Sequence, residues 1–205
     1  MVEANLDNFT IVILGKWNVA IFNPRWLSEH VFDKPEINVE FPVQPSAPFR
    51  ITGDGVRIIP HSDRLILGAT SDSDSNLEQM EGVACKLLSV LPHTPVSKIG
   101  INFGYESDRE PERLLGLLST LESNQLAGSG LKITGRVFGW SFECEDRILN
   151  LKCELNDHVA IDFNFHSDIK DSQEAKARIE GKVIQLKNKS RTFIREVFEL
   201  ELEEQ

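Results

Sequence analysis

The sequence predicts an α+β protein built from two pseudo-repeated units, each a strand, a helix, a run of antiparallel strands and a second helix. Residues 1–95 would form the first unit and residues 96–205 the second, within one domain. Their strands would pair into a curved sheet with the long helices on one face. The main observation is a set of four short matches that recur in the same order. The matched segments are 23–27 with 110–114, 50–53 (RITG) with 132–135 (KITG), 63–67 (DRLIL) with 146–150 (DRILN), and 80–82 with 179–181.

Alternating apolar and polar residues predict the strands. In residues 97–106, every second residue from Ile99 to Tyr105 is apolar, which is the period of a half-buried strand. Residues 10–22 would open the first unit as one or two strands, and residues 157–167 would add an extra strand to the second unit.

Capping patterns and apolar stripes predict the helices. Ser75 and Glu78 form a capping box at the start of the long helix of the first unit. In the second unit, one long helix is expected over residues 171–200, with residues 188–190 as the point where it would break. A short helix is expected after Ser107.

Composition narrows the possible partners and compartments. The net charge of −10 repels phosphate backbones and therefore argues against nucleic acid or an anionic membrane as the partner. The three cysteines have no CxxC spacing, which favours free thiols in a reducing cytosol and a cytoplasmic protein. The first residues do not resemble a secretory signal, and no apolar stretch approaches the roughly 20 residues of a membrane-spanning helix.

The most suggestive polar residues lie in the strand expected over residues 157–167. Alternation places His158, Asp162, Asn164 and His166 on one face of that strand. Two histidines and an aspartate suggest a metal, but a rise of about 3.3 Å per residue separates the two histidines by roughly 26 Å. The sequence therefore predicts no metal site and no cofactor, and a solvated sheet face is the simpler interpretation.

An antiparallel sheet that is covered by helices on one side leaves its other face exposed, and we expect the binding surface there. Arg136 and Lys152 would add positive charge to the polar residues of the extra strand. The residues expected on this face are Arg136, Asn150, Lys152, Glu154, Asp162, Asn164 and Asn102.

A second surface is suggested by residues 182–195, which contain five basic residues. They fit a cationic strip for an acidic partner or, more simply, the solvated face of a helix.

Motifs for catalysis are missing from the sequence. It has no GxSxG elbow, no phosphate-binding loop with its lysine, and no cysteine in a recognisable nucleophile context. The sequence predicts no catalytic residue and favours a protein that is not an enzyme, while an enzyme stays open.

Three segments of the second half carry a resemblance to known proteins. Residues 96–105 (VSKIGINFGY) form a basic-Ile-Gly-apolar strand, residues 159–165 (VAIDFNF) an apolar-Asp-apolar strand, and residues 186–200 a long closing helix. In this the chain resembles a sporadically distributed bacterial family of unknown function, which implies no activity and no catalytic residues. The order of elements also resembles the tandem plan of TATA-binding-protein-like and helix-grip folds, an analogy of fold and not of function.

Three functional hypotheses follow. The leading one is a non-enzymatic protein-binding or assembly subunit of a cytosolic, bacterial complex, which holds a protein partner or a second copy of itself through the exposed sheet face or a helix groove. The alternative is a small-molecule-binding protein or hydrolase with a pocket between sheet and helix, where His158, Asp162 and His166 would be the polar residues. The third, based on the distribution of the similar family, is a component of a bacterial defence or conflict system.

Overall fold

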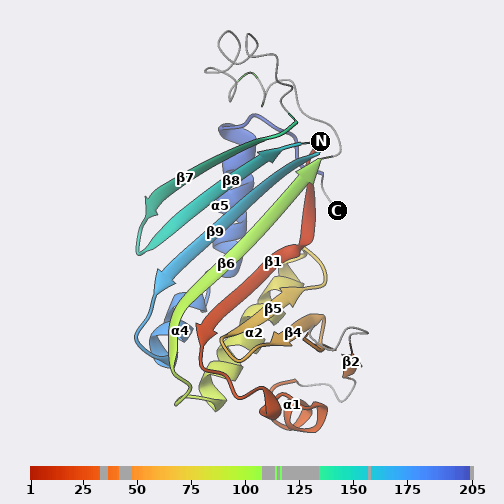
Figure 1. The fold of residues 1–205 in the computed structure, drawn as a ribbon, viewed down its shortest axis with the longest axis vertical. Coiled ribbons are helices and arrows are strands. Elements are labelled where there is room, and N and C mark those ends of the chain that lie inside the picture. The colour runs from red at the N-terminus through yellow and green to blue at the C-terminus, as the bar shows by residue number, and fades with distance from the viewer. Residues whose placement is uncertain are drawn as a thin grey trace.

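One antiparallel sheet dominates the structure. The computed structural model describes residues 1–32, 37–41, 48–107, 114, 116, 134–156 and 158–203. Within these residues nine strands form a single sheet in the order β2-β3-β4-β5-β1-β6-β9-β8-β7, and every neighbouring pair is antiparallel. Figure 1 shows the long strands in front and the helices α2, α4 and α5 behind them.

The elements have the following bounds. The strands are β1 (Glu3–Gly15), β2 (Asn38–Glu40), β3 (Arg50–Gly53), β4 (Val56–Pro60), β5 (Arg64–Ala69), β6 (Val96–Ser107), β7 (Arg136–Cys144), β8 (Arg147–Leu155) and β9 (Val159–Asp168). The helices are η1 (Val19–Ile21), α1 (Pro24–His30), α2 (Asp74–Val90), α4 (Ser172–Ile179) and α5 (Val183–Glu196). The short helix expected after Ser107 falls outside the described residues apart from Leu114 and Gly116, which are both helical. No helix in the described part of the chain combines the length and the apolar character needed to cross a membrane.

The predicted organisation as two repeated units is wrong. One large antiparallel sheet dominates the described residues, and no strand–helix unit is clearly repeated along it. The matched segments also occupy different places: residues 63–67 lie at the start of β5 beside β1, whereas residues 146–150 lead into β8, which β9 separates from β6. Residues 80–82 lie within α2, whereas residues 179–181 end α4. A turn followed by an apolar strand is a local signal that recurs without a shared topology.

The prediction of a single long helix over residues 171–200 is also wrong. It is divided into α4 and α5 at Gly181, whose φ of +70° is readily adopted only by glycine. Residues 188–190, where a break was expected, lie inside α5. Glu81 of α2 accepts hydrogen bonds from the backbone N–H groups of residues 181–183 at 2.7, 3.1 and 3.0 Å. This carboxylate caps α5, which has no side-chain cap of its own.

The core lies between the sheet and the helices. Phe103, Phe163 and Phe165 of β6 and β9 are each at most 1% exposed, and burial of such a side chain stabilises the fold by about 1.5–3 kcal/mol. The Tyr105 hydroxyl lies 2.7 Å from the Ser190 hydroxyl, which ties β6 to α5. Because successive residues of a strand point to opposite sides, the intervening residues lie on the face away from the helices, which we call the open face.

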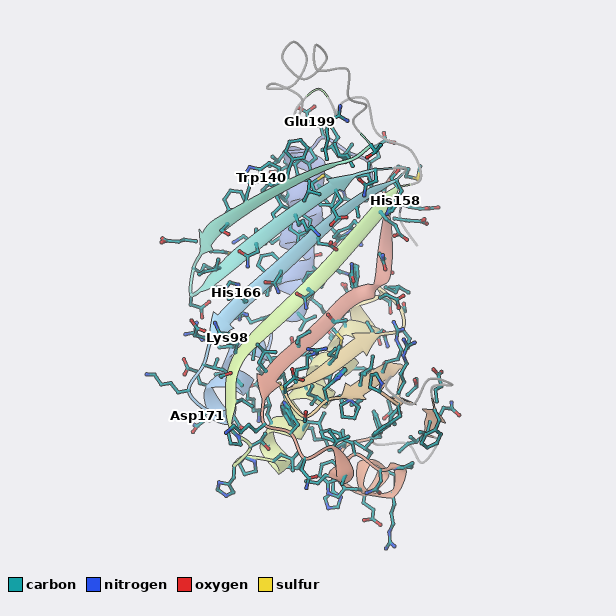
Figure 2. The ribbon with its side chains drawn as sticks, viewed as in Figure 1. Lys98, Trp140, His158, His166, Asp171 and Glu199 are labelled. Carbon is teal, nitrogen blue, oxygen red and sulfur yellow. The ribbon has the colours of Figure 1, made fainter. Side chains whose placement is uncertain are left out.

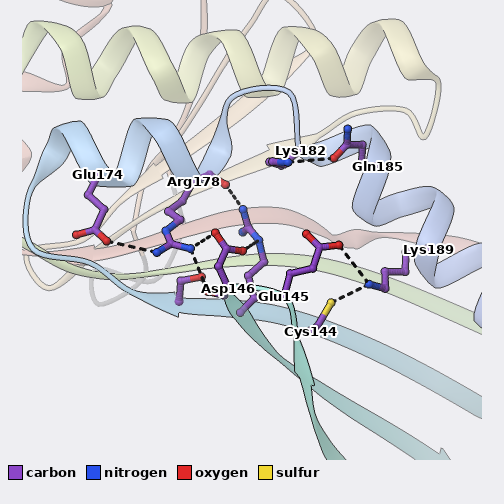
Figure 3. Close-up of polar contacts among 10 residues, drawn as sticks. Cys144, Glu145, Asp146, Glu174, Arg178, Lys182, Gln185 and Lys189 are labelled. Carbon is purple, nitrogen blue, oxygen red and sulfur yellow. Dashed lines mark hydrogen bonds and ion pairs between the residues drawn. The ribbon is translucent and has the colours of Figure 1, made fainter.

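The turn between β7 and β8 is tied to the helices by polar contacts (Figure 3). Arg178 of α4 forms ion pairs with Asp146 in the turn and with Glu174 one helical turn earlier. Lys189 of α5 donates to the Cys144 sulfur, with Nζ and Sγ 3.0 Å apart. These contacts hold one end of β7 and β8 against the helix layer.

Candidate functional site

A straight row of polar side chains crosses the open face over five neighbouring strands. Thr10 of β1 lies opposite Asn102 of β6, and Asn102 lies opposite Asn164 of β9. Asn150 of β8 lies on the other side of Asn164, and Ser141 of β7 lies opposite Asn150. Directly opposite residues in antiparallel strands have Cβ atoms about 4.5–5.5 Å apart, close enough for short polar side chains to meet. We call these five residues the amide row.

Hydrogen bonds link the whole amide row in one direction. The Ser141 hydroxyl donates to Asn150 Oδ1 at 2.8 Å, and Asn150 Nδ2 donates to Asn164 Oδ1 at 3.4 Å. Asn164 Nδ2 then donates to Asn102 Oδ1, and Asn102 Nδ2 donates to Thr10 Oγ1 at 3.0 Å. Each amide accepts from one neighbour and donates to the next, so the bonds polarise one another in the same sense. Within the row, Asn102 and Asn164 each use only one of their two N–H groups.

His166 joins the amide row through its Nδ1 nitrogen. Asn150 Nδ2 and His166 Nδ1 are 3.1 Å apart. An amide nitrogen can only donate, so in this contact Nδ1 of His166 is the acceptor. Because His166 and Asn150 belong to neighbouring strands, this contact adds a ring to the polar surface at the side of the row away from Asp162.

Next to the amide row, Asp162 marks the start of an acidic area. Asp162 lies opposite Lys152 in the register and accepts a hydrogen bond from Asn8 Nδ2 at 2.8 Å. Burial raises the pKa of the Asp162 carboxyl, although the bond from Asn8 and the charge of Lys152 act in the opposite direction. Lys152 forms an ion pair with Glu154, and this contact raises the pKa of the Lys152 ammonium group.

The acidic area extends to the end of the sheet. Glu3 of β1 lies directly opposite Glu106 of β6, and Glu106 also accepts from Asn5 Nδ2 at 2.9 Å. One strand further, Ala160 of β9 lies between Glu106 and Glu154. We call Glu3, Glu106, Glu154 and Asp162 the acidic end. Like charges in opposite positions destabilise a sheet, so this arrangement favours a positively charged group on the open face.

The structure brings four of the six residues predicted from sequence onto one surface: Lys152, Asp162, Asn164 and His166 all lie on the open face. Arg136 lies on the other face, because it is opposite the buried Leu155. His158 precedes β9 in the turn after β8 and is exposed. Figure 2 shows His158 and His166 near opposite ends of β9.

Thr10, Ser141 and Asn8 were missed by the sequence prediction. The local sequence does not mark these three residues as a group, and only the strand register shows which neighbours each one meets. Of the expected face residues, Asn102 and Asn150 turn out to be central to the amide row. A pattern that could have indicated them is an asparagine at an open-face position in each of three strands.

The alternative hypothesis required polar residues in a pocket between sheet and helix. The register places Asp162 and His166 on the side of the sheet away from the helices. A cavity of about 540 Å³ does lie between the start of α2 and residues 187–195 of α5. Its charged lining is largely paired internally: Lys187, which is only 4% exposed, bonds to Asp74 and to the Asp72 carbonyl. The basic stretch is thus partly buried, and its interpretation as a fully solvated helix face is wrong for Lys187.

The cysteines are free thiols in this structure. Burial raises the pKa of Cys85 to about 11 and the pKa of Cys153 to about 12. Both thiols are therefore protonated at neutral pH, and a protonated thiol is a poor nucleophile. In the described residues, no three histidine, cysteine or acidic side chains gather as a metal site requires.

Comparison with protein-family models and with curated sequences identifies no relative. No protein-family model matches the chain, and no curated protein has a significantly similar sequence. The resemblance of three segments to a bacterial family thus stays a prediction, and the function has to be inferred from the site.

Proposed function

We propose that this chain is a non-enzymatic protein-binding or assembly subunit of a cytosolic, bacterial complex, and that the open face holds its protein partner. The observation that carries the proposal is the pairing of Glu3 with Glu106 beside a half-buried, fully connected amide row. Opposed carboxylates cost stability in the free protein, and a basic group from a partner relieves that cost. The bacterial origin rests on the resemblance of three segments alone.

The amide row suits a polypeptide surface better than a small molecule. It extends across five strands in a line and includes unused N–H groups on Asn102 and Asn164, which match carbonyl acceptors on a partner. The amide row is uncharged, so it contributes hydrogen bonds whose geometry selects the partner, while the acidic end attracts a basic partner over a longer distance. A broad, half-exposed sheet face of this kind offers a large contact area for another protein and does not form a closed pocket for a small molecule.

The partner's contacting surface is expected to carry lysine or arginine. The acidic end contains Glu3, Glu106, Glu154 and Asp162, and Lys152 is the basic residue set among them. Together with the net charge of −10, this favours a basic protein segment and disfavours nucleic acid.

A pair of matched variants tests the proposal. Ala160→Arg places a cation between Glu106 and Glu154, where it forms ion pairs and leaves the fold intact while it blocks the acidic end. Gln173→Arg adds the same charge on the exposed side of α4 and serves as the control. Proteins captured from the native host by each variant and by the wild type are compared by quantitative mass spectrometry.

The expected result is a basic partner that the wild type and Gln173→Arg recover equally and that Ala160→Arg recovers at least about tenfold less, because like charges now meet at the interface. Binding should also weaken with added salt. A partner recovered equally by all three proteins, or no partner at all, would contradict the proposal.

A further inference from the structure

The two edges of the sheet differ sharply in the part of the chain that the structure describes. One edge is β2, a three-residue strand that carries a glutamate, and short, charged strands resist pairing with other chains. The other edge is β7, a nine-residue strand paired along its whole length with β8. Among the described residues no strand pairs with its outer side, so that side presents backbone N–H and C=O groups suited to another strand.

The side chains of β7 do not protect this edge. Phe138, Trp140 and Phe142 line the helix side as an aromatic stripe, and Phe142 is 39% exposed. Phe138 and Trp140 stack with ring centroids 6.1 Å apart. On the open face Val137 is 63% exposed. The strand contains no proline and no lysine, the residues that most often block such edges. Figure 2 shows Trp140 on the outermost strand.

We propose that β7 pairs in antiparallel fashion with β7 of a second copy of this chain, around a two-fold axis at Trp140. The occupant is a second copy because the strand is complementary to itself. In this register Trp140 meets Trp140 of the second copy, and Phe138 meets Phe142 in both directions, which joins the two aromatic stripes. All nine residues of β7 take part.

Charge also favours this register. Arg136 would lie opposite Cys144 and Glu143 opposite Val137, so no like charges face each other directly. A two-fold axis perpendicular to the sheet keeps the helix layers of both copies on one side and the open faces on the other. The two nine-stranded sheets become continuous, and two open faces lie next to each other.

This arrangement extends the proposed function without depending on it. Two amide rows on one surface would bind a partner with two contact segments by avidity. If the open face binds nothing, the dimer still forms, and if the dimer does not form, a single open face still binds its partner.

Gly139 offers a clean test at the centre of the edge. A Cβ added at Gly139 meets no atom within 4 Å, so substitutions there fit the folded chain. Gly139→Glu places a carboxylate opposite Lys152 within its own chain and two carboxylates diagonally across the two-fold axis, whereas Gly139→Thr adds bulk without charge and favours a strand. Light scattering after size exclusion measures the mass of the full-length protein at several concentrations.

The wild type and Gly139→Thr are expected at about 46 kDa, twice the 23.2 kDa of one chain. Gly139→Glu is expected to raise the dimer dissociation constant by about tenfold or more. A wild type that stays at 23.2 kDa at high concentration overturns the proposal. So does a dimer that Gly139→Glu does not weaken. Loss of the dimer in both variants supports the proposal, because it also places the interface at Gly139.

Hydrogen exchange on the unmodified protein gives a second measurement that needs no variant. Amides of residues 136–144 should exchange more slowly as the concentration rises, whereas residues 38–40 at the other edge should not change. Exchange of residues 136–144 that does not slow between concentrations at which the mass changes from monomer to dimer overturns the proposal.

Discussion

Glu81 gives the sharpest prediction about stability, because one carboxylate caps a helix far away in the sequence. Glu81 accepts hydrogen bonds from the backbone N–H groups of Gly181, Lys182 and Val183. Val183 is the first residue of α5, Lys182 is its N-cap and Gly181 precedes the cap, and no side chain of its own caps this helix. Replacing Glu81 by alanine leaves all three without this partner.

The magnitude follows from the exposure of the three N–H groups. The bond to Gly181 is exposed, so water replaces it at little cost. The Lys182 N–H also donates to the Ile179 carbonyl at 3.0 Å, so it keeps an acceptor when Glu81 is replaced. The bond to Val183 is partly buried, and loss of a charge-assisted bond at such a site costs about 1–1.5 kcal/mol. Glu81→Ala should therefore lower the free energy of unfolding by about 1–2 kcal/mol. Glu81→Gln keeps one acceptor oxygen and should lose about half as much.

Urea unfolding at pH 7, followed by circular dichroism and tryptophan fluorescence, measures these losses. Glu78→Ala is the control, because Glu78 is an exposed glutamate of the same helix and should change stability by no more than about 0.5 kcal/mol. If Glu81→Ala loses no more than Glu78→Ala, the cap contributes nothing and the reasoning is refuted.

Three further stability predictions concern the open face, a loop and the core. The folded state favours protonated Asp162, so Asp162→Asn should raise the Tm at pH 7, and this gain should vanish below the ordinary pKa of 3.8. A gain in Tm at all pH values would contradict this prediction. Asp168→Asn, at an exposed position of the same strand, is the control. Asn76→Ala should lower the free energy of unfolding in urea by about 2–3 kcal/mol, because the Asn76 side chain accepts from two backbone N–H groups and donates to the Gly55 carbonyl. A loss under about 0.5 kcal/mol would refute this prediction. Phe163→Ala should cost about 3–5 kcal/mol by the same assay, and a smaller loss would mean that the core collapses around the cavity.

Local patterns in the sequence were sufficient to place individual elements. The strands predicted over residues 97–106 and 157–167 are β6 and β9, because alternation reports directly on a half-buried strand. The helix expected from Ser75 exists as α2, but its cap is Ser73, because several serines and aspartates in a row offer equivalent caps.

The arrangement of the strands and helices could not be predicted from local patterns in the same way. Whether β5 or β8 lies next to a central strand depends on long-range pairing, and short segments such as 63–67 and 146–150 look alike in either position. The break at Gly181 has a local signal in the glycine itself, but the carboxylate of Glu81 that caps α5 lies 100 residues earlier and is invisible to helical periodicity.

The candidate site was predictable in part for the same reason. Alternation alone placed Asp162, Asn164 and His166 on one face of their strand. Alternation in an isolated strand cannot fix which face meets the helices, and Arg136 was assigned to the wrong one. The amide row needs the register of five strands, because it exists only where Asn102, Asn164 and Asn150 come into line.

The proposal that the open face binds a basic protein segment is tested most directly at the amide row itself. Nuclear magnetic resonance of protein labelled with ¹⁵N in its asparagine side chains would follow a titration with a lysine-rich nonapeptide, or with the recovered partner. The account predicts that the side-chain NH₂ signals of Asn102, Asn150 and Asn164 shift together in the wild type, and much less in Ala160→Arg. Shifts confined to asparagines outside the open face, such as Asn188 of α5, would contradict it.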